Sequence, residues 1–121
     1  MIPLKIETLL EGRVVEHDRV EYKTGWNPNA IIHSICAFAN DYDNTNGGYI
    51  VIGVKEEKGM PVFPLEGLPK EELDSIQQEI FQYCNMIVPR YIPRIELVDY
   101  KSTGTFLIYL WCPAGDSGPY Q

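Results

Sequence analysis

The sequence predicts an α+β fold, a single domain in which two main helices pack on a mixed β-sheet. With 121 residues the chain can bury one hydrophobic core. Two stretches with helical spacing of apolar residues alternate with stretches rich in β-formers. Residues 95–100 and 105–111 flank the turn sequence Lys-Ser-Thr-Gly at 101–104, which predicts a β-hairpin and therefore an antiparallel pair in the sheet.

The first elements are short. Residues 3–13 mix apolar side chains with glutamates and predict a short amphipathic helix or an arm. Residues 19–23 alternate polar and apolar side chains, which predicts a strand with Val20 and Tyr22 facing inward.

A buried helix and a buried strand are predicted next. Asn27 is suited to the N-cap and Pro28 to the first helical position. The residues 49–54 are nearly all apolar, as in a central strand that is covered on both faces. Between them lies the polar run 40–46. The apolar stripe of the helix consists of Ile31, Ile32, Ile35, Cys36, Phe38 and Ala39.

The second half continues with a turn at Lys58-Gly59 and an extended piece at 61–64 whose prolines suit a sheet edge. Pro69 is followed by two glutamates that favour the positive end of a helix. The apolar face of this second helix is formed by Leu73, Ile76, Ile80 and Cys84.

Composition limits the partners. The formal charge of −7 and the pI near 4.7 argue against a strongly basic nucleic-acid clamp, but they allow a local basic patch or an acidic site that meets phosphates through a divalent metal. No apolar run approaches the roughly 20 residues that cross a bilayer. The three cysteines lie in apolar patterns without a CxxC pair. We therefore expect reduced, buried thiols in a cytoplasmic protein without a membrane partner.

Three segments together resemble one family. They are EHDRVEYK (16–23), ICAFAN (35–40) and GGYIVIGVKEE (47–57). In this order they are similar to the Schlafen AlbA-like domain, also called the divergent-AAA domain, over about residues 11–120. The resemblance implies the mixed-sheet fold. It also implies that residues 1–121 are a DNA-binding domain at the N-terminus of a longer bacterial transcriptional regulator, acting as a possible homodimer.

The same resemblance implies an alternative activity. Animal Schlafen proteins cut RNA with three carboxylates and a divalent metal, and by motif these carboxylates correspond to Glu16, Glu21 and Glu56. No cofactor is predicted for the binding module, whereas the nuclease would use Mg²⁺ or Mn²⁺ on these three side chains. Glu56 stands where the animal nucleases have Asp. Glu16 and Glu21 are five residues apart, so they converge only if a turn or bulge interrupts the strand.

Phosphate contacts are predicted at two kinds of place. Lysines where strands end could meet phosphates, and exposed amides near the glycine pair that precedes the central strand could form an anion nest. Exposed lysines that keep a sheet soluble, and a plain turn, explain the same residues. No GxxxxGK[ST] motif occurs, so an ATP site is not expected. The predicted nucleic-acid-binding residues are Lys23, Lys55, Asn40, Asn46, Gly47 and Gly48.

Three functions thus remain open at this point. The first is a nucleic-acid-binding module that takes DNA more readily than RNA. The second is the metal-dependent RNA endonuclease, and the third is a domain retained only for protein interaction, which the charge of −7 favours.

Overall fold

The protein is described here by a computed structural model that covers residues 2–12, 19–41 and 47–121. Within these ranges, no helix combines the length and the hydrophobicity needed to cross a bilayer. The helices are α1 (Ile6–Glu11), α2 (Pro28–Ala39) and α3 (Leu73–Cys84), with the 3-10 turns η1 (Lys70–Glu72) and η2 (Tyr100–Ser102). The strands are β1 (Val20–Lys23), β2 (Gly48–Ile52), β3 (Glu56–Glu57), β4 (Met60–Pro61), β5 (Arg94–Asp99) and β6 (Phe106–Cys112).

The central sheet has four strands in the order β1-β2-β6-β5. Strands β1 and β2 are parallel, and the β2–β6 and β6–β5 pairs are antiparallel. Parallel neighbours need a crossover connection, and α2 lies within it. The predicted α+β class and mixed sheet are therefore confirmed.

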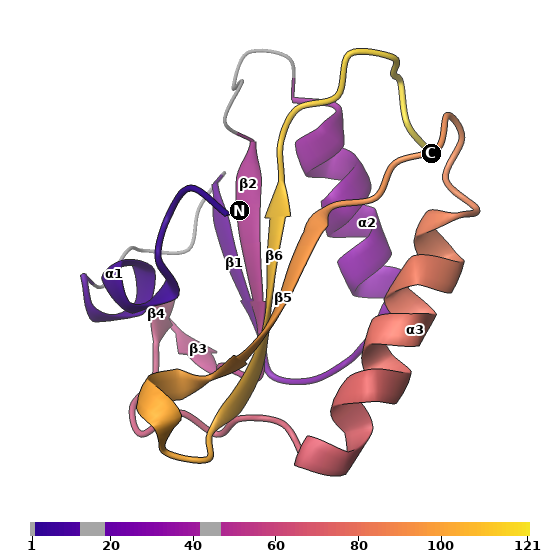
Figure 1. Cartoon of the computed structure of the whole chain (residues 1–121). Coiled ribbons are helices and arrows are strands. Elements are labelled where there is room, and N and C mark those ends of the chain that lie inside the picture. The colour runs from indigo at the N-terminus through magenta and orange to yellow at the C-terminus, as the bar shows by residue number, and fades with distance from the viewer. Residues whose placement is uncertain (1, 13–18, 42–46) are drawn as a thin grey trace.

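Helices cover the sheet on both faces (Figure 1). One face packs against α2 and α3, and the other packs against α1. All five residues of β2 are buried because this strand is central and has a helical layer on each side. The N-terminal segment, for which a helix or an arm was expected, forms the short helix α1 with Leu9 and Leu10 fully buried.

Helix α2 forms where its capping signal predicts it. The side chain of Asn27 accepts a hydrogen bond from the Ala30 amide at 3.4 Å, and Pro28 occupies the first turn. Ile31, Ile35 and Phe38 then face the sheet and are buried. The helix thereby begins near the end of β1, and four residues separate it from Lys23.

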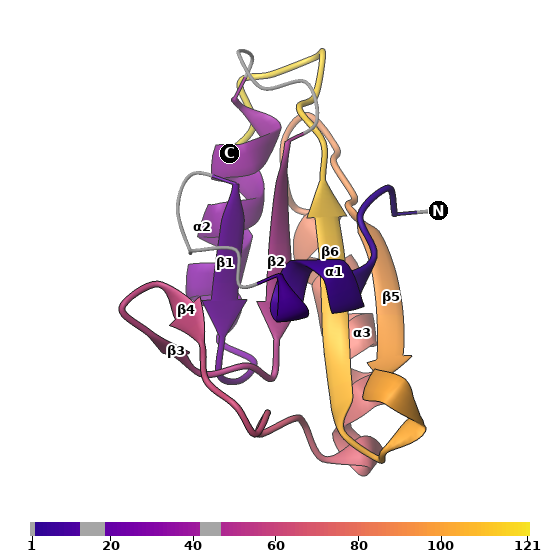
Figure 2. The ribbon, with the colours of Figure 1, turned by 90° about the vertical axis from the view of Figure 1, so that its left-hand side faces the viewer.

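Strands β3 and β4 form a separate two-stranded hairpin. Its central residues, Lys58 and Gly59, have φ angles of 54° and 78°, as in the type I′ turn that suits two-residue hairpins. The predicted turn is thus confirmed. Figure 2 shows that the hairpin projects from the domain beside the end of β1.

All three cysteines are free thiols. Cys84 and Cys112 are buried, whereas Cys36 is half-buried. Burial raises the pKa of Cys84 to about 11, so this thiol stays protonated at neutral pH. The expected burial of the thiols is thus found for Cys84 and Cys112, whereas Cys36 is only partly covered.

Candidate nucleic-acid interface

The carboxyl ends of β1 and β2 meet at one corner of the domain. The carbonyl oxygen of Lys23 accepts hydrogen bonds from the amides of Gly53 at 2.7 Å and Val54 at 3.1 Å. Lys55 follows directly and is exposed, and the side chain of Lys23 is half-buried. The two lysines predicted to contact phosphate are therefore anchored on hydrogen-bonded backbone at the same corner. We call this region, Lys23 together with residues 53–59, the lysine corner.

The hairpin adds a third cation to the lysine corner. Lys58 is exposed at the tip of the β3–β4 hairpin, whose first strand begins directly after Lys55. Sequence reasoning treated Lys58 only as a turn residue. The two-residue spacing between Glu57 and Met60, which are paired across the hairpin, was the signal that could have placed it at an exposed tip. Glu56 and Glu57 are exposed on the same hairpin and partly offset these positive charges.

Glu21 lies in the middle of β1, opposite Ile50 of β2. Val20 and Tyr22 are buried on the α1 side, so the alternation of a strand directs Glu21 and Lys23 to the face that α2 covers. The Oε2 atom of Glu21 is buried, and no hydrogen-bond partner for it exists among the described residues. A buried carboxylate oxygen without a donor is costly, and a bound cation would offset that cost.

The charge of Glu21 also reaches the core. Burial raises the pKa of the Cys112 thiol well above its usual value. The neighbouring Cys84 and the carboxylate of Glu21 add to this increase. Glu21 is therefore close enough to the Cys112 thiol to influence its ionisation.

Glu56 occupies a different environment. It is exposed in β3, and its Oε2 accepts a hydrogen bond from the Gly59 amide at 2.9 Å, which supports the hairpin turn. Among the described residues, no group of three histidine, cysteine or acidic side chains is arranged to hold a metal ion. Glu16, the remaining predicted ligand, lies outside the described residues. The Mg²⁺ or Mn²⁺ site thus stays a prediction. Of the two predicted ligands that the structure describes, Glu21 has the carboxylate oxygen without a hydrogen-bond partner among the described residues.

Gly47 and Gly48 lie at the start of β2, at the opposite end of that strand from the lysine corner. Both are buried. A Cβ atom on Gly47 would lie 1.8 Å from the carbonyl oxygen of Cys112, and one on Gly48 would lie 2.1 Å from the ring of Phe38. Close packing therefore accounts for both glycines. Phosphate binding by their amides stays a prediction, and so does the role of Asn46, which lies outside the described residues.

Asn40 joins the end of α2 to the C-terminal segment. Its Nδ2 donates to the Tyr120 carbonyl at 2.9 Å, and its Oδ1 accepts from the Tyr120 amide at 2.7 Å. The ring of Tyr120 packs against Tyr91 with centroids 5.2 Å apart. The side chain of Asn40 is thus engaged within the fold. Its contact with nucleic acid stays a prediction.

The geometry thus defines a mixed-sheet α+β domain with a lysine corner at the ends of its parallel strands. The family model described as Schlafen, AlbA_2 matches residues 16–121, which is most of the chain. The chain belongs to this family. A comparison with curated protein sequences found no match.

Two solved structures share the fold. The N-terminal domain of a RecG-related protein from Nitrosomonas europaea is 28% identical with a TM-score of 0.64, and the match covers 85% of this chain and 67% of that one. The DIP2311 protein from Corynebacterium diphtheriae is 19% identical with a TM-score of 0.58, and the match covers 95% of this chain and 22% of that one. The chain therefore spans less than a quarter of the length of the second structure.

Proposed function

We propose that this domain binds nucleic acid, duplex DNA in preference to RNA, through the lysine corner. The observation that carries the proposal is the pair of hydrogen bonds from Gly53 and Val54 to the Lys23 carbonyl, which hold Lys23 and Lys55 at one corner. Phosphate contacts from lysine position a protein on nucleic acid without reading its sequence. The N-terminus of α2, at Pro28, lies at the same end of the domain and favours negative charge.

The net charge of the chain limits the affinity for nucleic acid. Because the formal charge is −7, phosphates are attracted only locally and repelled elsewhere. Three lysines that each neutralise one phosphate give a slope of about −3 in a plot of log K against log salt. We therefore expect modest affinity that falls steeply with salt, and this behaviour suits a domain that adds to other contacts in a longer protein.

The comparisons with known proteins also support nucleic-acid binding. The chain belongs to the Schlafen AlbA_2 family, and the RecG-related structure carries a DNA-helicase name. We place the domain in a bacterial transcriptional regulator of the cytoplasm, where it would bring the rest of the protein to DNA.

The binding test uses labelled duplex DNA and transfer RNA, titrated at several salt concentrations with and without EDTA. The double variant Lys23→Gln/Lys55→Gln should bind DNA at least tenfold more weakly, with a salt slope smaller by about 2. The control variant Lys5→Gln/Arg90→Gln removes the same charge at exposed positions outside the corner and should bind almost normally. Equal loss in both double variants would contradict the proposed site. If neither nucleic acid binds at low salt, the protein-interaction alternative is favoured.

A metal-dependent RNA endonuclease is the second candidate. The buried Oε2 atom of Glu21, which has no hydrogen-bond partner among the described residues, favours it. Glu21 would hold Mg²⁺ or Mn²⁺ together with Glu16 and Glu56. The metal would supply a water activated for attack on the phosphate and would neutralise developing charge. Glu21 itself would contribute a carboxylate oxygen, which is a hard ligand that suits these ions. The metal ion would then take the place of a hydrogen-bond donor to this oxygen.

Two readouts separate this candidate from simple binding. The nuclease predicts Mn²⁺-dependent shortening of transfer RNA that Glu21→Gln abolishes, with Glu71→Gln on η1 as the control. It also predicts that Glu21→Gln lowers the affinity for Mn²⁺ in calorimetry. Intact RNA in both proteins, combined with unchanged metal binding, would exclude it.

A further inference from the structure

Strand β5 is an open edge of the sheet. The register pairs Arg94 with Trp111 and continues to Asp99 with Phe106, and the Tyr100 amide donates to the Thr105 carbonyl at 2.8 Å. In an antiparallel ladder, alternate residues exchange hydrogen bonds with the neighbour, so the backbone groups of Ile95, Leu97 and Asp99 point away from β6. Within the described chain, no backbone hydrogen bond reaches these outward groups. Figure 2 shows β5 at the margin of the sheet with no strand beyond it.

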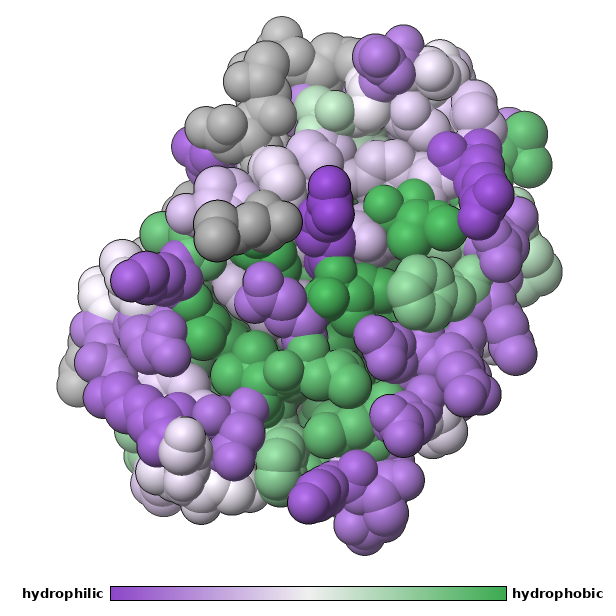
Figure 3. Space-filling view, viewed as in Figure 1, coloured by the Kyte–Doolittle hydropathy of each residue, from purple (hydrophilic) through white to green (hydrophobic). Residues whose placement is uncertain are grey.

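Apolar side chains border this edge on the α3 face. Ile95 is half-buried and packs against the core that α2 and α3 share, and Leu97, which is 39% exposed, lies on the same face by the alternation of a strand. The hydropathy view shows apolar residues gathered in the middle of this side of the molecule, with hydrophilic residues among and around them (Figure 3). Unpaired strand backbone beside exposed apolar surface is a template for another strand.

We propose that a second copy of this chain pairs along β5, antiparallel and about a twofold axis at Ile95, to form one continuous eight-stranded sheet. Around such an axis Ile95 faces its own copy, so Arg94 of each chain faces Glu96 of the other. Both side chains are exposed on the α1 face of the strand. The pairing thus brings together two pairs of opposite charges and two apolar residues in contact.

Other registers lack this complementarity. An axis at Glu96 places two glutamates opposite each other, and like charges in that position destabilise a strand pair. An axis at Leu97 places Ile95 opposite Asp99 and Arg94 opposite Tyr100. Neither Arg94 nor Asp99 then faces an opposite charge. Charge complementarity therefore selects the register at Ile95.

This inference is independent of the proposed function. The order β1-β2-β6-β5 puts the lysine corner on the opposite side of the sheet from β5. Pairing along β5 therefore leaves Lys23, Lys55 and Lys58 accessible in both copies. The dimer can fail while nucleic-acid binding stands, and the reverse is also true.

Sedimentation velocity from micromolar to millimolar protein tests the dimer. The chain should shift from monomer to dimer as its concentration rises. Arg94→Glu and Glu96→Arg alone should each weaken dimerisation by roughly tenfold or more, because both cross-strand pairs become repulsive. The double variant Arg94→Glu/Glu96→Arg should restore it. Lys58→Glu and Glu57→Arg carry the same charge changes on the hairpin and serve as controls.

An equal mixture of the two single variants gives the decisive result. The Arg94→Glu chain carries glutamate at both positions, and the Glu96→Arg chain carries arginine at both. Each glutamate of one chain then faces an arginine of the other, so heterodimers should form although each variant alone stays mostly monomeric. Circular dichroism of each variant establishes that it is folded. A wild-type chain that stays monomeric at every concentration, or a folded mixture without heterodimers, would overturn the proposal. Ile95→Cys should also cross-link under oxidation, and cross-linking through Leu97→Cys instead would overturn the register.

Discussion

At Gly48 the space that a side chain would need is occupied by the ring of Phe38. Gly47 has a φ of 67°, and its neighbour across the sheet is the backbone of Cys112 and Pro113. From the sequence, the pair was compatible with a phosphate-binding nest and also with a plain turn. The structure shows that both glycines allow close approach of the backbone to a packed neighbour.

This packing makes a prediction about stability. Gly48→Ala should lower the free energy of unfolding by about 1–3 kcal/mol, because the added methyl overlaps the Phe38 ring. Gly25→Ala is the matched control, since no atom lies within 4 Å of the site and its effect should stay within about 0.5 kcal/mol. Urea unfolding measures both values.

A second substitution identifies the cause. If the overlap with Phe38 is responsible, Phe38→Leu should cost less in the Gly48→Ala background than in the wild-type protein. Additive effects of the two substitutions would show that the loss at Gly48 has another origin.

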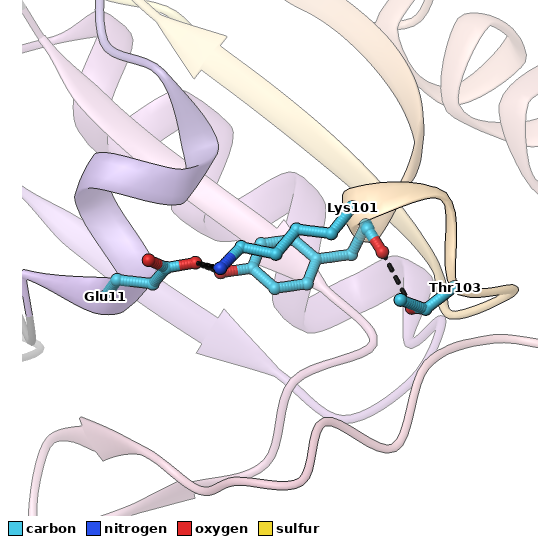
Figure 4. A network of polar contacts seen from close by, with 4 residues as sticks. Glu11, Lys101 and Thr103 are labelled. Atoms are coloured by element: carbon cyan, nitrogen blue, oxygen red, sulfur yellow. Dashed lines mark hydrogen bonds and ion pairs between the residues drawn. The ribbon is translucent and has the colours of Figure 1, made fainter.

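At the scale of elements, α1 is joined to the β5–β6 connection by a small polar network (Figure 4). The hydroxyl of Tyr100 donates to Oε2 of Glu11 at 2.7 Å, and Lys101 forms an ion pair with the same oxygen. These hydrogen bonds to Lys101 and Tyr100 hold the pKa of Glu11 below its ordinary value of 4.5. Thr103 completes the turn by donating to the Tyr100 carbonyl at 2.7 Å.

The network predicts a pH-dependent contribution of Glu11. Because folding lowers the pKa of Glu11, its stabilisation is fully present above the unfolded-state value near 4.5 and is lost as pH falls through the folded-state pKa. Glu11→Gln keeps an acceptor for Tyr100 but removes the charge. The variant should therefore melt below the wild type at neutral pH, and the two should converge in acid.

Thermal unfolding over a pH series checks this convergence. Glu7→Gln removes a carboxylate from the same helix and serves as the control. A difference between Glu11→Gln and wild type that persists unchanged in acid would contradict the role of the charge.

At the scale of the whole molecule, the C-terminal segment fastens two distant parts of the chain. Asn40 holds the backbone of Tyr120 on both sides, and Val88 and Gln121 exchange two backbone hydrogen bonds of 2.9 and 3.2 Å. The end of α2 and the loop after α3 are thereby connected through residues 120–121.

Asn40→Ala should lower the free energy of unfolding by about 1–3 kcal/mol, because it leaves the amide and the carbonyl of Tyr120 without partners. The C-terminal segment should also become more sensitive to carboxypeptidase. Asn29→Ala, at an exposed position in the first turn of the same helix, should be nearly neutral. Unchanged stability combined with weaker DNA binding would instead support the predicted nucleic-acid contact of Asn40.

The helices, strands and hairpin were predictable because their signals are local. The Asn27-Pro28 cap, the alternation in β1 and the apolar run of β2 each depend on residues close in sequence. The family could be inferred for the same reason, from three short motifs in order. The meeting of Lys23 with the segment after β2 was also foreseeable once two strands were expected to end at the same edge.

Only the tertiary structure decided which residues share a surface. Parallel pairing of β1 and β2 places Lys23 and Lys55 at one end and Gly47-Gly48 at the other, although the sequence suggested all four for one interface. The engagement of Asn40 with Tyr120 joins residues 80 positions apart. The free edge of β5 follows from the strand order alone. Periodicity and capping determine each element locally, whereas these arrangements arise from contacts between distant segments that no short sequence pattern records.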